Sequence, residues 1–279
     1  MNRFNYKKTF MSFLKYLTLI AWTIIVFLPI ITIIFGAFKT YEEFNGTNGI
    51  TPPQNFFNFE NFKIAFEKGK MAMGFINTFI LILFGVGGSI IIGSMVAYGI
   101  NRFEFKFKKT ILFLYLLVSI VPMEMAQVST FRIINSIGMY NTRLAPLVLY
   151  IGADVIMVYI YLQMLEKIPR ELDKAAMLEG ANYFTIYRKI IFPLLKPATA
   201  TVAMLKIVSI YNDFYIPFLY MPGENMQTVS TSLFKFIGPA GTDWQLICAA
   251  ILISMVPMII FFIVLQKHIY SGITAGSIR

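Results

Sequence analysis

The chain has 279 residues, of which 57% are hydrophobic, 16% aromatic and only 14% charged, and its mean hydropathy of +0.69 excludes an ordinary soluble domain. The net charge of +10 comes from short basic clusters between apolar runs, which indicates membrane topology rather than a nucleic-acid-binding surface. One cysteine and one histidine exclude an intramolecular disulfide and argue against a Cys/His metal or haem centre and against a His-dependent hydrolase.

The N-terminal part predicts a membrane span followed by an outer loop. An apolar run at 16–38 is long enough to cross a bilayer and too long for the apolar region of a signal peptide, and no A-x-A cleavage site follows it. We therefore expect a retained first span. The loop at 39–74 contains the aromatic stretch 55–62, which could lie along the outer interface or meet a soluble partner. We favour the membrane interface for its phenylalanines.

A second span is expected at 75–100, with small residues repeating every four positions along one face. These residues are Gly85, Ser89, Gly93 and Ala97. Small side chains allow close approach of another helix in lipid, so the repeat predicts packing within the chain or against a partner subunit.

The third and fourth spans are expected at 110–131 and 144–165, and both contain polar residues. Glu124 and Gln127 follow a proline in the third run, and Asp154 lies near the middle of the fourth. A carboxylate inside a membrane usually faces a cavity or a partner. For Glu124 an outer span boundary is an equal alternative, and for Asp154 pairing within the bundle and lining of a pathway both remain open.

The polar interruption at 166–196 predicts a short amphipathic helix on the cytoplasmic side. Ala175, Ala176 and Gly180 place small side chains along one edge, where the surface of another protein can approach the backbone, and the glycine permits a sharp turn. The hypothesis is a docking element, and the alternative is a plain surface helix between two spans.

The fifth span is expected at 197–220 and the sixth at 245–265. Lys206 and Asp213 are seven residues apart, which would place them on one helix face, and Pro217 is expected to interrupt the helix. Polar groups beside aromatic rings suit a sugar, but the alternative, an internal lock between spans, is slightly favoured. The basic clusters place both termini in the cytoplasm. The predicted fold is a single all-α membrane domain at 1–279 with six transmembrane helices.

Three motifs resemble those of one family. Ala175-Ala176 followed by Gly180 and Pro193 is similar to the EAA loop of ABC-importer membrane subunits, and the surrounding residues resemble the carbohydrate-uptake branch, of the maltose and glycerol-phosphate type. Asn212-Asp213-Phe214 and the tail at 272–276 add to this resemblance. Lys174 and Glu179 depart from the motif, where the family has Glu and usually Asp.

The resemblance implies that the loop is a coupling helix seated in a groove of an ATPase subunit. The docking residues it implies are Glu171, Lys174, Ala175, Ala176, Glu179, Gly180, Tyr183 and Phe184. The candidate substrate pathway comprises Glu124, Gln127, Asp154, Tyr211, Asn212 and Asp213.

The implied function is that of a permease subunit in a binding-protein-dependent importer of a sugar or oligosaccharide, in the plasma membrane of a prokaryote. Its expected partners are a second, non-identical permease, two ATPase subunits, an extracytoplasmic sugar-binding protein and the lipid bilayer, with no nucleic acid. No cofactor or metal is expected on this chain, because ATP and magnesium would bind the ATPase and the sequence has no P-loop motif.

Alternatives remain open at this point. The importer could carry a non-sugar solute, the buried charges could serve an ion-coupled secondary transporter, or the chain could be a membrane scaffold without transport of its own.

Overall fold

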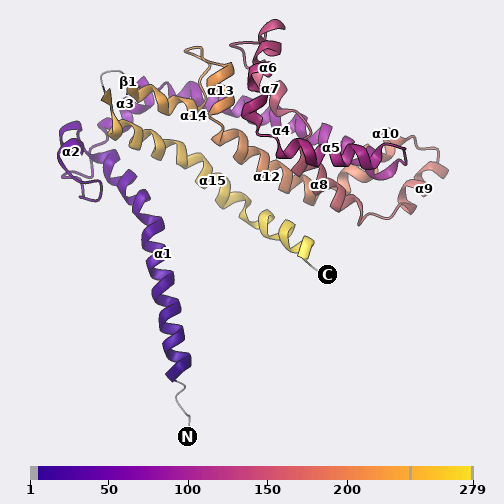
Figure 1. Cartoon of the computed structure of the whole chain (residues 1–279), viewed down its shortest axis with the longest axis horizontal. Helices are drawn as coiled ribbons and strands as arrows, with labels where there is room; N and C mark the ends of the chain where they lie inside the picture. Colours follow the sequence, from indigo (N-terminus) through magenta and orange to yellow (C-terminus); the bar gives the residue numbers. More distant parts are fainter. Residues whose placement is uncertain (1–5, 239–240, 278–279) are drawn as a thin grey trace. The chain divides into compact units, whose positions relative to one another are not determined.

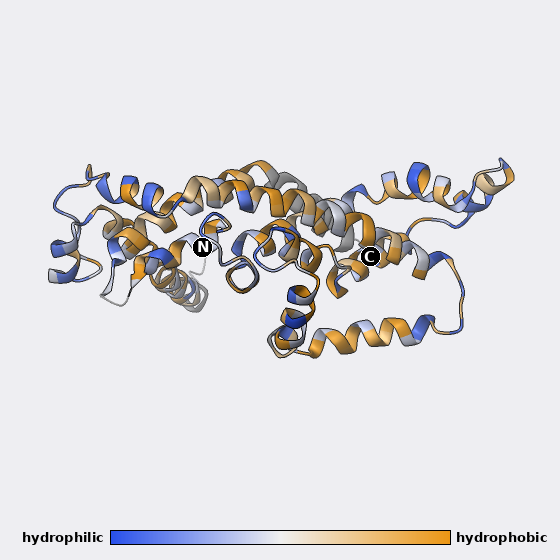
Figure 2. Cartoon of the chain, turned by 90° about the horizontal axis from the view of Figure 1, so that it is seen from above, coloured by the Kyte–Doolittle hydropathy of each residue, from blue (hydrophilic) through white to orange (hydrophobic). Residues whose placement is uncertain are grey.

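The structure is a computed structural model that describes the backbone of residues 6–238 and 241–277 and the side chains of 10–122, 125–238 and 241–264. Helices account for 76% of the chain (Figure 1). They form two compact units: Met1–Met71 with Leu233–Pro257, and Ala72–Ser232 with Met258–Arg279. Figure 2 shows that the helices are mostly hydrophobic and that hydrophilic residues gather in the connecting segments.

The first unit contains α1 (Tyr6–Phe38), α2 (Tyr41–Gly46), α3 (Glu60–Lys68), a 3-10 turn (Leu233–Phe236), strands β1 (Ile237–Gly238) and β2 (Gly241–Thr242), and the first part of α15 (Trp244–Ser277). The strands pair antiparallel, with Ile237 opposite Thr242. The second unit contains α4 (Met71–Arg102), α5 (Lys108–Ile120), α6 (Met123–Ser136), α7 (Leu144–Tyr150), α8 (Val155–Leu165), α9 (Glu171–Leu178), α10 (Tyr183–Ile186), a π-helical turn (Tyr187–Ile191), α11 (Phe192–Leu194), α12 (Lys196–Asn212), α13 (Tyr215–Tyr220) and α14 (Val229–Ser232).

In the first unit, the aromatic segment after α2 closes the C-terminal end of α1. The Asn61 amide donates to the carbonyls of Ala37 and Lys39, at 2.8 and 2.7 Å, so two backbone acceptors at the helix end are satisfied. The ring of Phe62 lies 5.1 Å from that of Phe38. Phe57 is 83% exposed. The expected membrane anchoring therefore stays a prediction for Phe57, whereas Phe62 packs against the helix.

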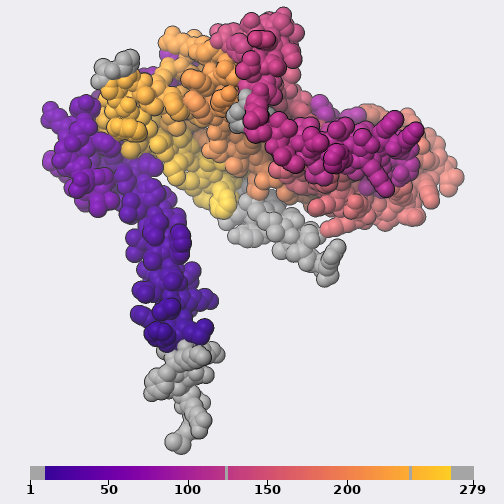
Figure 3. All heavy atoms as spheres, in the orientation of Figure 1, coloured from indigo at the N-terminus to yellow at the C-terminus, as the bar shows by residue number. Residues whose placement is uncertain are grey.

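The side chains of α1 are exposed throughout 10–29, and Figure 3 shows this helix in indigo as a rod of surface atoms. An apolar helix without packing partners along that stretch is typical of a segment that faces lipid or another subunit.

In the second unit, the small residues of α4 pack against the region around α7 and α8. A Cβ atom at Gly85 would lie 3.2 Å from Tyr150 Cβ, and one at Gly93 would lie 2.5 Å from Met157 Cε. Ser89 Oγ donates to the Tyr150 carbonyl at 2.6 Å, and Ala97 is fully buried. The predicted close packing of this face is confirmed, and the helices that it meets belong to the same chain.

Gly93→Leu is expected to destabilise this unit by about 3 kcal/mol, because the new side chain would occupy the space of Met157 and push α4 from α8. The measurement is the amount and melting temperature of the purified protein. Gly87→Leu is the matched control, since a Cβ at Gly87 meets no atom within 4 Å. Equal melting temperatures for the two variants would contradict the packing.

The described part of the chain contains three helices long and apolar enough to cross a membrane: Phe10–Phe38, Met71–Arg102 and Trp244–Val264. Three further spans are possible if bent helix pairs are counted as one, with bends of 103° between α5 and α6, 41° between α7 and α8, and 76° between Tyr183–Leu194 and α12. The described residues therefore contain three to six candidate spans.

The fifth predicted span is divided. Helix α12 ends at Asn212, Asp213 is extended with φ −69° and ψ 115°, and α13 begins at Tyr215. Pro217 lies in the first turn of α13, where a missing N–H costs little. The interruption expected from Pro217 is thus present, a few residues before the proline itself.

Candidate functional site

Helix α9 and the turn after it have one buried and one exposed face. Asp173 and Ala176 are buried, and the other α9 side chains are exposed. Gly180 ends the helix at φ +87°, a left-handed conformation that glycine adopts without strain, and the Ala181 N–H donates to the Ala176 carbonyl at 3.0 Å. Asn182 then caps α10 by accepting a hydrogen bond from the Thr185 N–H at 2.8 Å.

The exposed face carries large apolar side chains. Leu178 is 91% exposed, Phe184 60% and Tyr183 53%. Most of the residues expected at a docking surface share this exposure, namely Glu171, Lys174, Ala175, Glu179, Gly180, Tyr183 and Phe184. Large apolar side chains gathered on an exposed surface are typical of a contact with another protein or with a membrane. Leu178 was not among the expected docking residues, although its place beside the turn glycine was a usable signal.

Ala176 differs from the other predicted docking residues because it faces inward. It is 8% exposed and belongs to the same apolar core as Tyr98, Leu165 and Ile186. A surface role for Ala176 does not fit this position, and a charge placed there would be expected to disturb folding before it disturbed docking.

Sequence reasoning missed the groups that hold α9 in place. Arg102 Nη2 at the end of α4 lies 3.1 Å from Asp173 Oδ2, with side chains only 6% and 8% exposed. The contact is ionic rather than a well-aligned hydrogen bond, because Asp173 Oδ2 has no hydrogen-bond partner among the described residues. No local pattern could reveal this pair, since its members are far apart in the sequence.

A second, exposed charge cluster lies beside the segment. Lys108 Nζ is 3.1 Å from Glu104 Oε1, and Arg170 Nη2 is 3.6 Å from the same oxygen. Two effects of Lys108 lower the pKa of the Glu104 carboxyl below its usual value: the hydrogen bond that Lys108 donates is the larger, and its positive charge is the second. Glu104 is therefore ionised at neutral pH, and salt is expected to weaken this exposed cluster.

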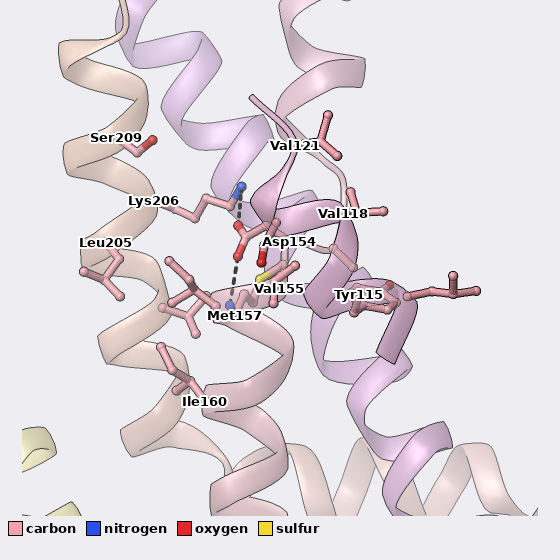
Figure 4. A pocket seen from close by; sticks show the side chains of 15 residues that line it. Tyr115, Val118, Val121, Asp154, Val155, Met157, Ile160, Leu205, Lys206 and Ser209 are labelled. Carbon is pink, nitrogen blue, oxygen red and sulfur yellow. Dashed lines mark hydrogen bonds and ion pairs between the residues drawn. The ribbon is translucent and has the colours of Figure 1, made fainter. Parts of the chain in front are cut away.

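A cavity of about 780 Å³ lies between α5, α8 and α12 (Figure 4). Its wall is mostly apolar, with Val118 from α5 and Ile160 from α8 among the lining residues. Tyr115 faces the cavity from α5. The other polar side chains that line the cavity are those of Asp154, Lys206, Ser119 and Ser209. The cavity can accept a ligand that combines apolar faces with a few hydroxyl groups.

An ion pair forms the charged part of the cavity wall. Lys206 Nζ lies 2.8 Å from Asp154 Oδ2, with the side chains 16% and 44% exposed (Figure 4). Asp154 Oδ1 accepts a hydrogen bond from the Met157 N–H at 2.8 Å and so caps α8. Pairing of Asp154 within the bundle is thus observed, and the same pair lines the cavity, whereas lining of a transport pathway stays a prediction.

Asp213 occupies a different environment from Lys206. Because α12 ends at Asn212, the two residues do not share one helix face, and that expectation is wrong. Asp213 Oδ2 accepts a hydrogen bond from the Tyr150 hydroxyl at 2.8 Å, and Oδ1 accepts one from the Ile216 N–H at 3.1 Å. These contacts favour the interpretation of Asp213 as a lock between segments.

Three other candidate pathway residues, Gln127, Tyr211 and Asn212, are not among the described residues that line this cavity. Gln127 Oε1 accepts a hydrogen bond from the Tyr220 hydroxyl at 2.6 Å, and Asn212 donates to the Val208 carbonyl of its own helix at 2.9 Å. Tyr211 is buried. The side chain of Glu124 and those of the tail motif at 272–276 lie outside the described residues. Among described side chains, no group of three or more His, Cys, Asp or Glu residues could hold a metal ion.

Asp213→Asn is expected to lower the stability of the protein by about 1–2 kcal/mol, because the asparagine still accepts the Ile216 N–H at the start of α13 but leaves the Tyr150 hydroxyl without its charged acceptor. Tyr150→Phe should produce a similar loss, and the double variant should be no less stable than either single one. Melting temperatures of the four purified proteins test this. Additive losses would show that the two groups act independently.

Comparisons with known proteins identify the family. A family described as binding-protein-dependent transport system inner membrane component matches residues 89–275. The melibiose/raffinose/stachyose import permease protein MelC of Bacillus subtilis (strain 168) is 33% identical over 224 residues, which cover 80% of this chain and 81% of that protein. The probable starch degradation products transport system permease protein AmyC of Thermoanaerobacterium thermosulfurigenes is 28% identical over 282 residues, which cover 100% of both chains.

A solved structure shows the same fold. It is described as the crystal structure of a bacterial ABC transporter involved in the import of the acidic polysaccharide alginate, and its matching chain has a TM-score of 0.80 and 19% identity, with 96% of this chain and 99% of that chain covered. The family resemblance indicated by the sequence motifs is thereby confirmed. The chain belongs to the family of binding-protein-dependent transport system inner membrane components.

Proposed function

We propose that the chain is a permease subunit of an ATP-driven importer that moves a sugar or oligosaccharide into a prokaryotic cell. The observation that carries this proposal is the exposed apolar segment of α9 and α10, set in a chain of this family. The substrate class rests on relatives named for melibiose, raffinose and stachyose, for starch degradation products and for galactooligosaccharides.

The proposed topology is a single membrane domain at 1–279 with six spans in the plasma membrane, and with both termini and the loop 166–196 in the cytoplasm. The distribution of basic residues supports this orientation. Helix α9 would then meet an ATPase subunit, with Leu178, Tyr183 and Phe184 as its apolar contacts.

The proposed complex contains this chain, a second, non-identical permease, two ATPase subunits that bind ATP and magnesium, and an external sugar-binding protein. The segments 39–74 and 221–244 would face that binding protein. Closure of the ATPase pair would displace the docking helices as rigid bodies and switch the spans between inward-open and outward-open states. Ligand and nucleotide must each favour one of these states for transport to be coupled. The cavity with Asp154 and Lys206 would line this chain's side of the pathway.

Purification and transport test the proposal together. When the chain is expressed with its genomic neighbours, a second permease and an ATPase should co-purify with it in fixed ratio. The complex in liposomes should take up one of the trisaccharides raffinose, maltotriose or galactotriose only with ATP on the ATPase side and with the binding protein present. Uptake by this chain alone under an ion gradient would contradict the proposal and support a secondary transporter. ATP-driven uptake of an amino acid or peptide would retain the importer and reject the sugar.

A further inference from the structure

Helix α4 is attached to the docking segment by several polar contacts, although the two are far apart in the sequence. Besides its ion pair with Asp173, Arg102 Nη2 donates to the Ile168 carbonyl at 3.1 Å. The Tyr98 hydroxyl donates to Asp173 Oδ1 at 3.3 Å. Asp173 is the one charged side chain that α9 buries, and both of these side-chain partners come from α4.

Two more contacts extend this attachment to either side of α9. Arg170 Nη2 donates to the Asn101 carbonyl at 2.7 Å, and the hydroxyls of Ser94 and Tyr187 share a hydrogen bond at 2.7 Å. The neighbours of the docking segment along the chain are α8 and the helices that lead to α12. The end of α4 is therefore a third attachment, made through hydrogen bonds and an ion pair and not through the continuous chain.

Farther along α4, its small-residue face is joined to the cavity wall. Ser89 Oγ donates to the Tyr150 carbonyl at 2.6 Å, and Lys206 Nζ approaches the same oxygen at 3.4 Å. Lys206 also forms the ion pair with Asp154. At 1.5 Å per residue, the helix between Ser89 and Arg102 spans roughly 20 Å. One continuous helix thus connects the docking segment to the ion pair at the cavity.

We propose that α4 is the rigid link that carries the displacement of the docking segment to the cavity, and that Arg102 and Asp173 are the positioning residues that fasten its end to α9. The inference rests on the proposed function. The physical basis of the proposal is that a buried ion pair is costly to break. Helix α9 therefore cannot shift without either moving α4 or leaving a buried charge unpaired. The close packing at Gly85 and Gly93 then prevents α4 from sliding past α7 and α8.

The test uses the whole importer in liposomes with the trisaccharide that the wild type transports. Asp173→Asn, Arg102→Gln and the double variant are compared for three quantities: ATPase bound per permease, maximal ATP hydrolysis, and sugar taken up per ATP hydrolysed. Glu166→Gln is the matched control, because it neutralises an exposed carboxylate at the end of α8.

We expect both single variants to bind the ATPase and hydrolyse ATP as the wild type does, while uptake per ATP falls about fivefold to tenfold and falls no further in the double variant. The control should keep the wild-type ratio. Unchanged uptake per ATP in the single variants would overturn the proposal. A fold-reduction in the double variant equal to the product of the two single reductions would overturn it as well. Loss of ATPase binding would also overturn it, because the pair would then shape the docking surface instead of transmitting movement.

If the charge variants do not accumulate in the membrane, Tyr98→Phe tests whether α4 links the docking segment to the cavity. It removes one hydroxyl from Asp173 and leaves the apolar packing in place, and uptake per ATP should fall about twofold to threefold. A wild-type ratio in this variant would count against the link. Absence of ATP-driven uptake in the wild type itself would instead reject the proposed function.

Discussion

Leu178→Asp is expected to abolish ATP-dependent sugar uptake by releasing the ATPase from the permease. Leu178 is 91% exposed on α9, a higher exposed fraction than that of Tyr183 or Phe184 on the proposed docking surface. A central apolar contact in an interface is commonly worth about 2 kcal/mol or more, and an aspartate would in addition bury an unpaired charge. The measurement is the amount of ATPase that co-purifies with the permease, together with uptake in liposomes.

Leu178→Met is the control for this variant, since methionine keeps the apolar volume and should retain both ATPase binding and uptake. Because Leu178 does not contribute to the core of its unit, neither substitution should change the melting temperature of the permease alone. Wild-type recovery of the ATPase with Leu178→Asp would show that α9 does not dock there, whatever the effect on uptake.

Lys206→Met is expected to reduce the amount of folded permease strongly, because Asp154 would lose the cation with which it pairs. Removal of one partner from a fully buried pair costs about 3–5 kcal/mol, and the partial exposure of Asp154 lowers the expected cost to about 2 kcal/mol. The amount of permease in the membrane and its melting temperature measure this loss.

The double variant Asp154→Asn with Lys206→Met separates a structural role from a role in the pathway. Asparagine still accepts the Met157 N–H as the cap of α8, and no charge is left unpaired, so the amount of folded permease should recover. We expect sugar uptake per complex to stay about tenfold lower, because the cavity has lost polar groups that a sugar hydroxyl could bind. Recovery of both quantities would show that the pair only holds the helices together.

Much of the architecture could be predicted from local sequence patterns. The apolar runs coincide with the long helices α1, α4 and α15, because about twenty consecutive apolar residues are stable as a helix in lipid and unstable as a loop. The repeat of Gly85, Ser89 and Gly93 predicted a close helix contact, since side-chain size by itself decides how near two backbones can come.

Local patterns failed where the result depended on a partner from a distant segment. Ala176 was expected at the surface, but α9 is turned so that this residue and Asp173 face the core, and that rotation is set by Arg102 and Tyr98 of α4. Lys206 was expected on the same face as Asp213, but the break after Asn212 separates them, and Lys206 pairs with Asp154 instead.

The sequence by itself determined the membrane class, the family and the exposed polar segment for which we propose docking, because hydropathy, residue size and motif spacing are properties of contiguous residues. Only the tertiary structure decided which charges pair, which face of α9 is exposed and where the cavity lies. These features depend on the rotation and register of helices whose contacting residues lie tens of positions apart, and no periodicity within one helix specifies the helix that will pack against it.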